Sequence, residues 1–96
     1  MIRSVVLFSV KEGTRPEQLD AIVRAMKAMQ FEGCLRWELV RDLRLREGNI
    51  PYAFVSEFDD EAAYRAYDTN GEHNRVRREL LAPIVEKLER FQYEVS

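Results

Sequence analysis

The stretch Ile2-Arg3-Ser4-Val5-Val6-Leu7-Phe8-Ser9-Val10 decides the fold. Successive side chains of a strand point to opposite faces, so Val6 and Phe8 point one way and Val5 and Leu7 point the other. Both faces of this strand are therefore apolar, whereas an antiparallel sheet with one solvated face is apolar on one side only. A chain of 96 residues does not hold enough helix to cover both faces. The sequence therefore predicts that a second copy covers one of them.

The composition is that of a globular chain forming one domain over residues 1–96. Hydrophobic residues make up 46% and charged residues 33% of the sequence, unlike disordered or fibrous chains. The net charge of −2 argues against a nucleic-acid partner, because such proteins carry a basic face. The single cysteine, Cys34, leaves no internal disulfide and is expected to be a small buried residue rather than a nucleophile. No apolar run approaches the ~18 residues of a membrane span, so we expect a cytoplasmic protein with no membrane partner.

A helix is predicted after the first strand. Thr14 as the N-cap, Pro16 in the first turn and Glu17 closing a capping box indicate where it begins. Apolar residues then recur at helical spacing with charged residues between them. The predicted buried stripe comprises Leu19, Ile22, Val23, Met26 and Met29.

Two strands are predicted next. Leu35, Trp37 and Leu39 alternate with charged residues, which is typical of a half-buried strand. Residues 41–50 are mostly polar and predict a loop. Residues 52–58 are rich in aromatic and β-branched side chains and predict the third strand.

The last third of the chain predicts a broken helix and a final strand. Asp59-Asp60 cap a short helix, Asn70-Gly71 interrupt it, and helix resumes over residues 72–81. Residues 88–95 form the last strand. The order is therefore β-α-β-β-α-β, and right-handed crossovers make this an α+β, ferredoxin-like antiparallel sheet with the helices on one face.

The sheet face away from the helices is expected to be a contiguous apolar patch, which on a small protein marks an interface. Its predicted members are Val5, Leu7, Val55, Phe91, Tyr93 and Val95.

Three segments resemble the stress-responsive α/β-barrel (Dabb) family. Residues 2–8 opening into Lys11-Glu12-Gly13-Thr14 are similar to its first strand. Residues 63–67, followed by His73 and residues 80–86, resemble its second helical segment, and Phe91-Gln92-Tyr93-Glu94-Val95 resembles its closing strand. The resemblance spans the whole chain. It implies a homodimer in which two sheets pack face to face as a dimeric, eight-stranded α+β barrel.

The resemblance also implies a site between the sheet and the helices. In a ring-closing cyclase of the family, a histidine of the second helical segment and a nearby tyrosine line a pocket, and these correspond to His73 and Tyr67. The first-strand histidine of that cyclase corresponds to Ser4, which is a departure from the pattern. If Phe91 faces the partner, as the family implies, Arg90 points towards the helices. There it either pairs with a carboxylate or snorkels to solvent, or else it binds an anionic ligand.

The predicted ligand-binding residues lie on the helix-facing side of the sheet. They are Ser4, Val6, Phe8, Trp37, Phe54, Phe58, Leu88 and Arg90, with His73 and Tyr67 as the candidate catalytic pair. One histidine and one cysteine do not supply the three or four ligands of a zinc site, and no glycine-rich phosphate loop is present. The sequence therefore predicts neither a metal nor a cofactor.

Three functional hypotheses follow from these residues. The first is a homodimeric, stress-responsive α/β-barrel protein that binds a small apolar or aromatic ligand. The second is a cofactor-free cyclase, lyase or monooxygenase-type enzyme with His73 as its acid or base. The third is a structural stress protein that acts through oligomerisation. A cavity between sheet and helices favours the first two, whereas a filled interior favours the third.

Overall fold

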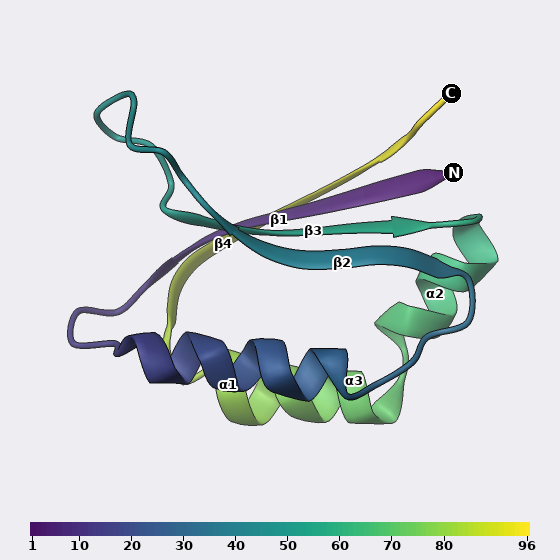
Figure 1. Ribbon diagram of the computed structural model, residues 1–96, viewed down its shortest axis with the longest axis horizontal. Coiled ribbons are helices and arrows are strands. Elements are labelled where there is room, and N and C mark those ends of the chain that lie inside the picture. Colours follow the sequence, from purple (N-terminus) through teal and green to yellow (C-terminus); the bar gives the residue numbers. More distant parts are fainter.

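A four-stranded antiparallel sheet carries every helix on one face, as the computed structural model of residues 1–96 shows (Figure 1). The strands are β1 (Ile2–Val10), β2 (Cys34–Arg41), β3 (Tyr52–Phe58) and β4 (Val85–Glu94), in the spatial order β2-β3-β1-β4. The helices are α1 (Pro16–Lys27), α2 (Glu61–Asp68) and α3 (Gly71–Val76), and α3 continues into the π-helical segment η1 (Arg77–Leu81). The predicted ferredoxin-like βαββαβ fold is confirmed.

The pairing of β1 with both neighbours assigns each side chain to a face. Val6 pairs with Phe54 and Arg90, so these residues share the helix-facing side. Val5 pairs with Val55 and Phe91 on the opposite side, which we call the open face. The two faces of the first strand are thus separated as its alternation predicts.

The core lies between the helix-facing side of the sheet and the helical layer. Phe8, Phe58 and Ile22 are its most completely buried large side chains, and Leu19 and Met26 of α1 are buried beside them. On the open face, by contrast, Leu7 is 38% exposed and Phe91 is 65% exposed. Hydrophobic side chains of this size gain free energy on burial, at about 25 cal/mol per Å². The open face therefore retains apolar surface that the chain itself does not cover.

The start of α1 differs from the prediction by one residue. Arg15, not Thr14, is the N-cap, and its backbone N–H donates to Oε1 of Gln18 at 2.9 Å. The Thr14 hydroxyl instead donates to the carbonyl of Lys11 at 2.7 Å, because it closes the turn after β1. Pro16 occupies the first helical position, where its missing N–H costs nothing.

A β-bulge at the start of β2 makes the predicted burial of Leu35 wrong. Cys34 pairs with Phe58 and Trp37 pairs with Ser56, so three steps along β2 match two along β3. The extra residue is Leu35, which is exposed, while Cys34 packs against the core in its place. A bulge of this kind shifts the alternation by one residue, which explains the error.

The first short helix, α2, begins directly after the predicted Asp59-Asp60 cap, and α3 begins at Gly71, one residue before the predicted start. The Asp60 carboxylate accepts the backbone N–H of Ala63 at 2.9 Å, and the Asn70 side chain accepts that of His73 at 3.0 Å. Both are standard N-caps. The last strand begins at Val85, three residues before the predicted start. No helix of the structure is long and apolar enough to cross a membrane.

Gly33 lies where the chain from α1 passes close to α2, and we expect its replacement by alanine to destabilise the fold. Its φ is +77°, and an added Cβ would lie 2.6 Å from the Cβ of Ala63. The left-handed backbone alone costs a non-glycine residue about 1–2 kcal/mol, and the clash adds to this. Gly48→Ala is the matched control, since its φ is +84° with no atom within 4 Å. Urea unfolding should show a larger loss for Gly33→Ala, and equal losses would contradict the clash.

Candidate functional site

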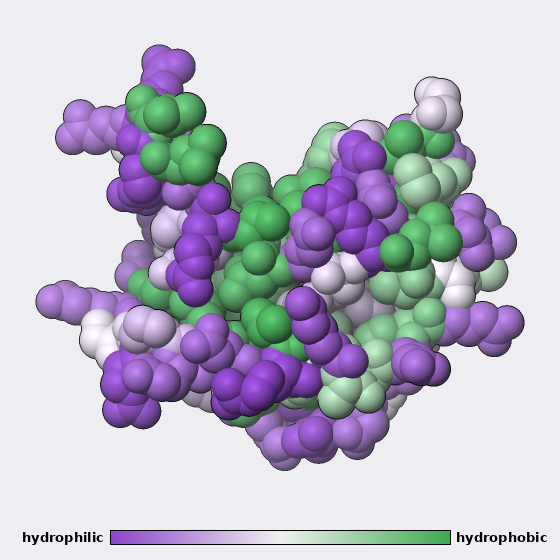
Figure 2. Space-filling view, viewed as in Figure 1, coloured by the Kyte–Doolittle hydropathy of each residue, from purple (hydrophilic) through white to green (hydrophobic).

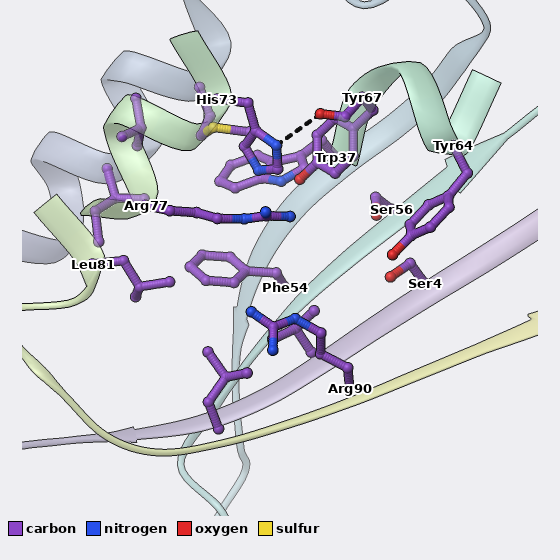
Figure 3. Close-up of a pocket in the computed structure, with 15 residues that line it drawn as sticks. Ser4, Trp37, Phe54, Ser56, Tyr64, Tyr67, His73, Arg77, Leu81 and Arg90 are labelled. Carbon is purple, nitrogen blue, oxygen red and sulfur yellow. Dashed lines mark hydrogen bonds between the residues drawn. The ribbon is translucent and has the colours of Figure 1, made fainter. Parts of the chain in front are cut away.

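A pocket opens between the sheet and the helical layer, and fifteen residues line it (Figure 3). The empty space amounts to about 570 Å³ when the open mouth is included, and about 50 Å³ of it admits the centres of water-sized atoms. Eight of the ten residues predicted for the site line this pocket. They are Ser4, Val6, Trp37, Phe54, Tyr67, His73, Leu88 and Arg90.

Phe8 and Phe58 were expected in the pocket lining, and the structure places both in the core behind it. Each is 0% exposed. The Phe8 ring stacks on Phe54 with centroids 4.6 Å apart, and the Phe58 ring packs against Tyr67 at 4.9 Å. Aromatic contacts of this geometry stabilise both rings beyond simple burial. These two residues therefore hold Phe54 and Tyr67 in place and have no surface left for a ligand.

One end of the pocket carries three hydroxyl groups. Ser4 of β1, Ser56 of β3 and Tyr64 of α2 point towards one another there (Figure 3). Nε2 of Gln92 donates to the Ser4 hydroxyl oxygen at 3.1 Å, which leaves the hydroxyl hydrogen of Ser4 free for another acceptor. Burial raises the pKa of the Tyr64 phenol, so it stays protonated. The sequence analysis missed Ser56, although its alternation with Phe54 places it on the helix-facing side.

Two guanidinium groups enter the pocket, Arg77 from the helical layer and Arg90 from β4 (Figure 3). Arg77 donates to Oδ1 of Asp68 at 2.6 Å and to Oδ1 of Asn74 at 2.9 Å, so it is neutralised and fixed. Arg90 is exposed at the mouth of the pocket and forms no ion pair with any carboxylate. Its charge is the one in the pocket that lacks a counter-ion. Arg77 was not predicted, although it lies four residues after the candidate His73 and therefore on the same side of the helical segment.

His73 is buried on the pocket wall with 4% exposure. Its Nδ1 lies 2.9 Å from the backbone carbonyl oxygen of Tyr67, and since a carbonyl only accepts, Nδ1 carries the hydrogen. Burial, helped by the nearby Arg77 guanidinium, lowers the pKa of His73 to about 4. The imidazole is therefore neutral at pH 7, with Nε2 as an acceptor.

Tyr67 supports His73 through its backbone and its ring. The centroids of the Tyr67 and His73 rings lie 4.0 Å apart, and the ring planes are inclined by 31°. Burial raises the pKa of the Tyr67 phenol to about 12. The phenol is therefore a hydrogen-bond donor and not a base at neutral pH.

The remaining titratable groups form no metal site, since no three His, Cys, Asp or Glu side chains are grouped to hold an ion. Cys34 lies outside this pocket, and burial raises the pKa of its thiol. A raised pKa keeps the sulfur protonated, which is the unreactive form.

Residues 2–95 match the family described as the Stress responsive A/B Barrel Domain, Dabb. The chain belongs to this family. The match includes every residue that lines the pocket, from Ser4 to Arg90. No curated protein sequence matches the chain.

Solved structures of similar fold agree with the family assignment. A Dabb family protein with a ferredoxin-like fold from Mesorhizobium loti is 25% identical, with a TM-score of 0.80 over 99% of this chain and 96% of its own. A dimeric ferredoxin-like protein of unknown function from Thermobifida fusca is 24% identical, with a TM-score of 0.83 over 98% and 90%. A hydroxynitrile lyase from Passiflora edulis is 20% identical, with a TM-score of 0.83 over 99% and 93%.

Proposed function

We propose that this Dabb-family protein binds a small aromatic or apolar carboxylic acid between its sheet and its helices, without a cofactor. The observation that carries the proposal is Arg90, whose guanidinium enters the pocket with no carboxylate beside it. A guanidinium matches a carboxylate with two parallel hydrogen bonds. We therefore expect the ligand to carry an anionic group that pairs with Arg90.

The pocket walls define the rest of the ligand. Trp37 and Phe54 lie with centroids 5.4 Å apart at 27°, and present an aromatic surface suited to a flat ring. The hydroxyls of Ser4, Ser56 and Tyr64 lie at the other end and suit a phenol or carbonyl oxygen on that ring. The space in which the centres of water-sized atoms fit is about 50 Å³. This limits the ligand to roughly one ring unless side chains at the mouth move. A hydroxylated benzoate has this shape and polarity.

Arg90→Ala is expected to weaken the binding of such an acid by about tenfold or more, because hydrogen bonds to charged groups contribute roughly 1.5–3 kcal/mol. Calorimetric titration with benzoate and its hydroxylated analogues measures the effect. Arg24→Ala on the exposed side of α1 is the control. Equal affinity for neutral benzamide and for benzoate would contradict the role of charge.

A second candidate is proton-transfer chemistry at His73, which its free Nε2 acceptor favours. A base whose pKa is about 4 is mostly unprotonated at pH 7 but weak. Ser4, on the facing strand, has no activating base of its own. We therefore expect the purified protein not to cyclise linear aromatic polyketides at a useful rate, as product analysis by liquid chromatography would show. Robust turnover that persists in His73→Ala would contradict both this expectation and the choice of site.

We also propose that the protein is a homodimer joined through its open face. The first strand is apolar on both sides, and Val5, Leu7, Val55, Phe91 and Tyr93 share the side without helices. Solved structures of this fold include proteins described as dimeric.

Free Cys34 suits a reducing compartment such as the cytoplasm. A structural role through oligomerisation alone would require the pocket to bind nothing, which the titration above tests.

A further inference from the structure

A row of polar residues crosses the helix-facing side of the sheet, although hydrophobic side chains gather between the sheet and α1 (Figure 2). Ser56 of β3 pairs with Ser4 of β1, and Ser4 pairs with Gln92 of β4. The flanking positions of β3 on this side are the buried Phe54 and Phe58. Ser4 is 3% exposed and Ser56 is 4% exposed. Burying a hydroxyl costs free energy unless it finds a hydrogen-bond partner, so this row interrupts the apolar core at a cost.

The hydroxyl hydrogens at this end of the pocket have no acceptor within the protein. The bond that Ser4 accepts from Gln92 is the only hydrogen bond made by the hydroxyls of Ser4, Ser56 and Tyr64. Each hydroxyl still carries one hydrogen to donate, and buried donors in folded proteins are nearly always paired. All three side chains line the pocket. A group that enters the pocket is therefore the acceptor that these hydroxyls lack.

The fold holds the three hydroxyl side chains in place. Ser4 and Ser56 lie directly opposite each other on paired strands, which brings their Cβ atoms to about 4.5–5.5 Å. The Tyr64 ring packs edge-on against the Phe58 ring, with centroids 5.5 Å apart and an interplanar angle of 81°. The three side chains point towards one another (Figure 3). Donors that are fixed in this way lose little conformational entropy when a ligand binds.

A carbonyl oxygen matches these hydroxyls better than a phenol or a second carboxylate does. It has two lone pairs and no hydrogen, so it accepts from two hydroxyls at once. A phenol would add its own hydrogen to three that already lack acceptors. A carboxylate would be buried there without a counter-ion, because the Arg77 guanidinium is already paired with Asp68 at 2.6 Å. The chemistry of this end of the pocket therefore favours an uncharged carbonyl.

The spacing along the strands separates the carbonyl position from the carboxylate position by about one ring. Arg90 and Gln92 are two residues apart on β4 and belong to neighbouring rows of the sheet. At about 3.3 Å per residue, these rows lie roughly 6.6 Å apart. This is about the span between two substituents of one benzene ring. Phe54 lies in the row of Arg90, so an aromatic surface accompanies that ring.

We propose that the ligand is an aromatic keto acid, whose ketone oxygen accepts hydrogen bonds from the hydroxyls of Ser56 and Tyr64. Its carboxylate pairs with Arg90 at the mouth of the pocket, and its ring lies between these two positions. Ser4 donates from the same side of the sheet, and Gln92 holds the Ser4 hydroxyl oxygen. This inference rests on the proposed binding of an aromatic acid and specifies the second polar group of that acid.

Pairs of ligands that differ in one oxygen atom test this inference. The 3- and 4-acetylbenzoates carry a ketone, and the corresponding isopropenylbenzoates replace its oxygen by a CH₂ group of similar size. Calorimetric titration of the wild type gives the affinity for each. The better-bound acetylbenzoate should bind at least about tenfold more tightly than its isopropenyl counterpart, because each of two neutral hydrogen bonds contributes roughly two- to tenfold.

The variant Ser56→Ala/Tyr64→Phe removes two donors and keeps the shapes of both side chains. The preference for the ketone should fall to about threefold or less, whereas the affinity for the isopropenyl analogue should stay within about threefold of the wild type. Loss of structure would weaken both ligands alike. Ser9→Ala is the matched control, since it makes the same change on β1 outside the pocket, and it should keep the full preference.

The outcomes separate the keto acid from the proposed binding of an aromatic acid. If benzoate does not bind, or binds Arg90→Ala as tightly as the wild type, both are overturned. If benzoate binds through Arg90 but the acetyl and isopropenyl compounds bind equally, the keto acid alone is overturned. A ketone preference that survives in the Ser56→Ala/Tyr64→Phe variant also overturns it. So does tighter binding of a hydroxybenzoate or a benzenedicarboxylate than of either acetylbenzoate.

Discussion

Leu7→Asp should convert the proposed dimer to a folded monomer. Leu7 lies at the centre of the open face, between Ala53 of β3 and Glu89 of β4. A carboxylate buried without a partner costs several kcal/mol, and a two-fold dimer buries two of them. The neighbouring Glu89 adds repulsion of like charge. We expect the dissociation constant to rise at least about 1,000-fold, which corresponds to about 4 kcal/mol, and sedimentation velocity to show monomer at micromolar concentration.

The monomer should remain folded because Leu7 points away from the core and is already 38% exposed. Circular dichroism of the variant should therefore match that of the wild type. Ala62→Asp is the matched control, since it adds the same charge at an exposed position of α2. It should leave the dimer intact. A Leu7→Asp protein that still sediments as a dimer would place the interface elsewhere.

The fold was predictable because its signals are local and periodic. The alternation of residues 2–10 assigned both faces of β1, the Asp59-Asp60 cap located α2, and the interruption at Asn70-Gly71 separated α2 from α3. The errors occur where a local irregularity breaks the period. The bulge beside Cys34 exposes Leu35, and the turn after β1 engages the Thr14 hydroxyl. Neither irregularity has a periodic signal in the sequence.

The site was less predictable than the fold, since it depends on how helices lie over strands. The register of β1 and β4 was enough to place Ser4 and Arg90 on one side. It could not distinguish residues that line a pocket from those packed behind it, so Phe8 and Phe58 were misplaced. Arg77 lies four residues after His73 on the same side of the helical segment, and its pairing with Asp68 is a contact between two helical segments. Such contacts follow from tertiary packing and not from local propensity.

The protein should lose stability in mild acid because of His73. Its pKa is about 4 in the folded chain against an ordinary value of 6.5, since burial and Arg77 disfavour the charged ring. Between these two pH values the unfolded state binds a proton that the folded state does not. The stabilisation is therefore fully present above pH 6.5 and is lost as the pH falls towards 4. The full shift corresponds to an upper limit of about 3 kcal/mol.

His73→Asn isolates this contribution from that of the carboxylates. An asparagine amide can still donate to the Tyr67 carbonyl, which accepts from Nδ1 in the wild type, but it does not titrate. Urea unfolding at a fixed protein concentration, from pH 7 to pH 4, gives the free energy of unfolding of both proteins. The advantage of the wild type over the variant should shrink steadily below pH 6.5, because only the wild type takes up the extra proton on unfolding. A difference that stays constant down to pH 4 would mean that His73 is not held neutral by its surroundings.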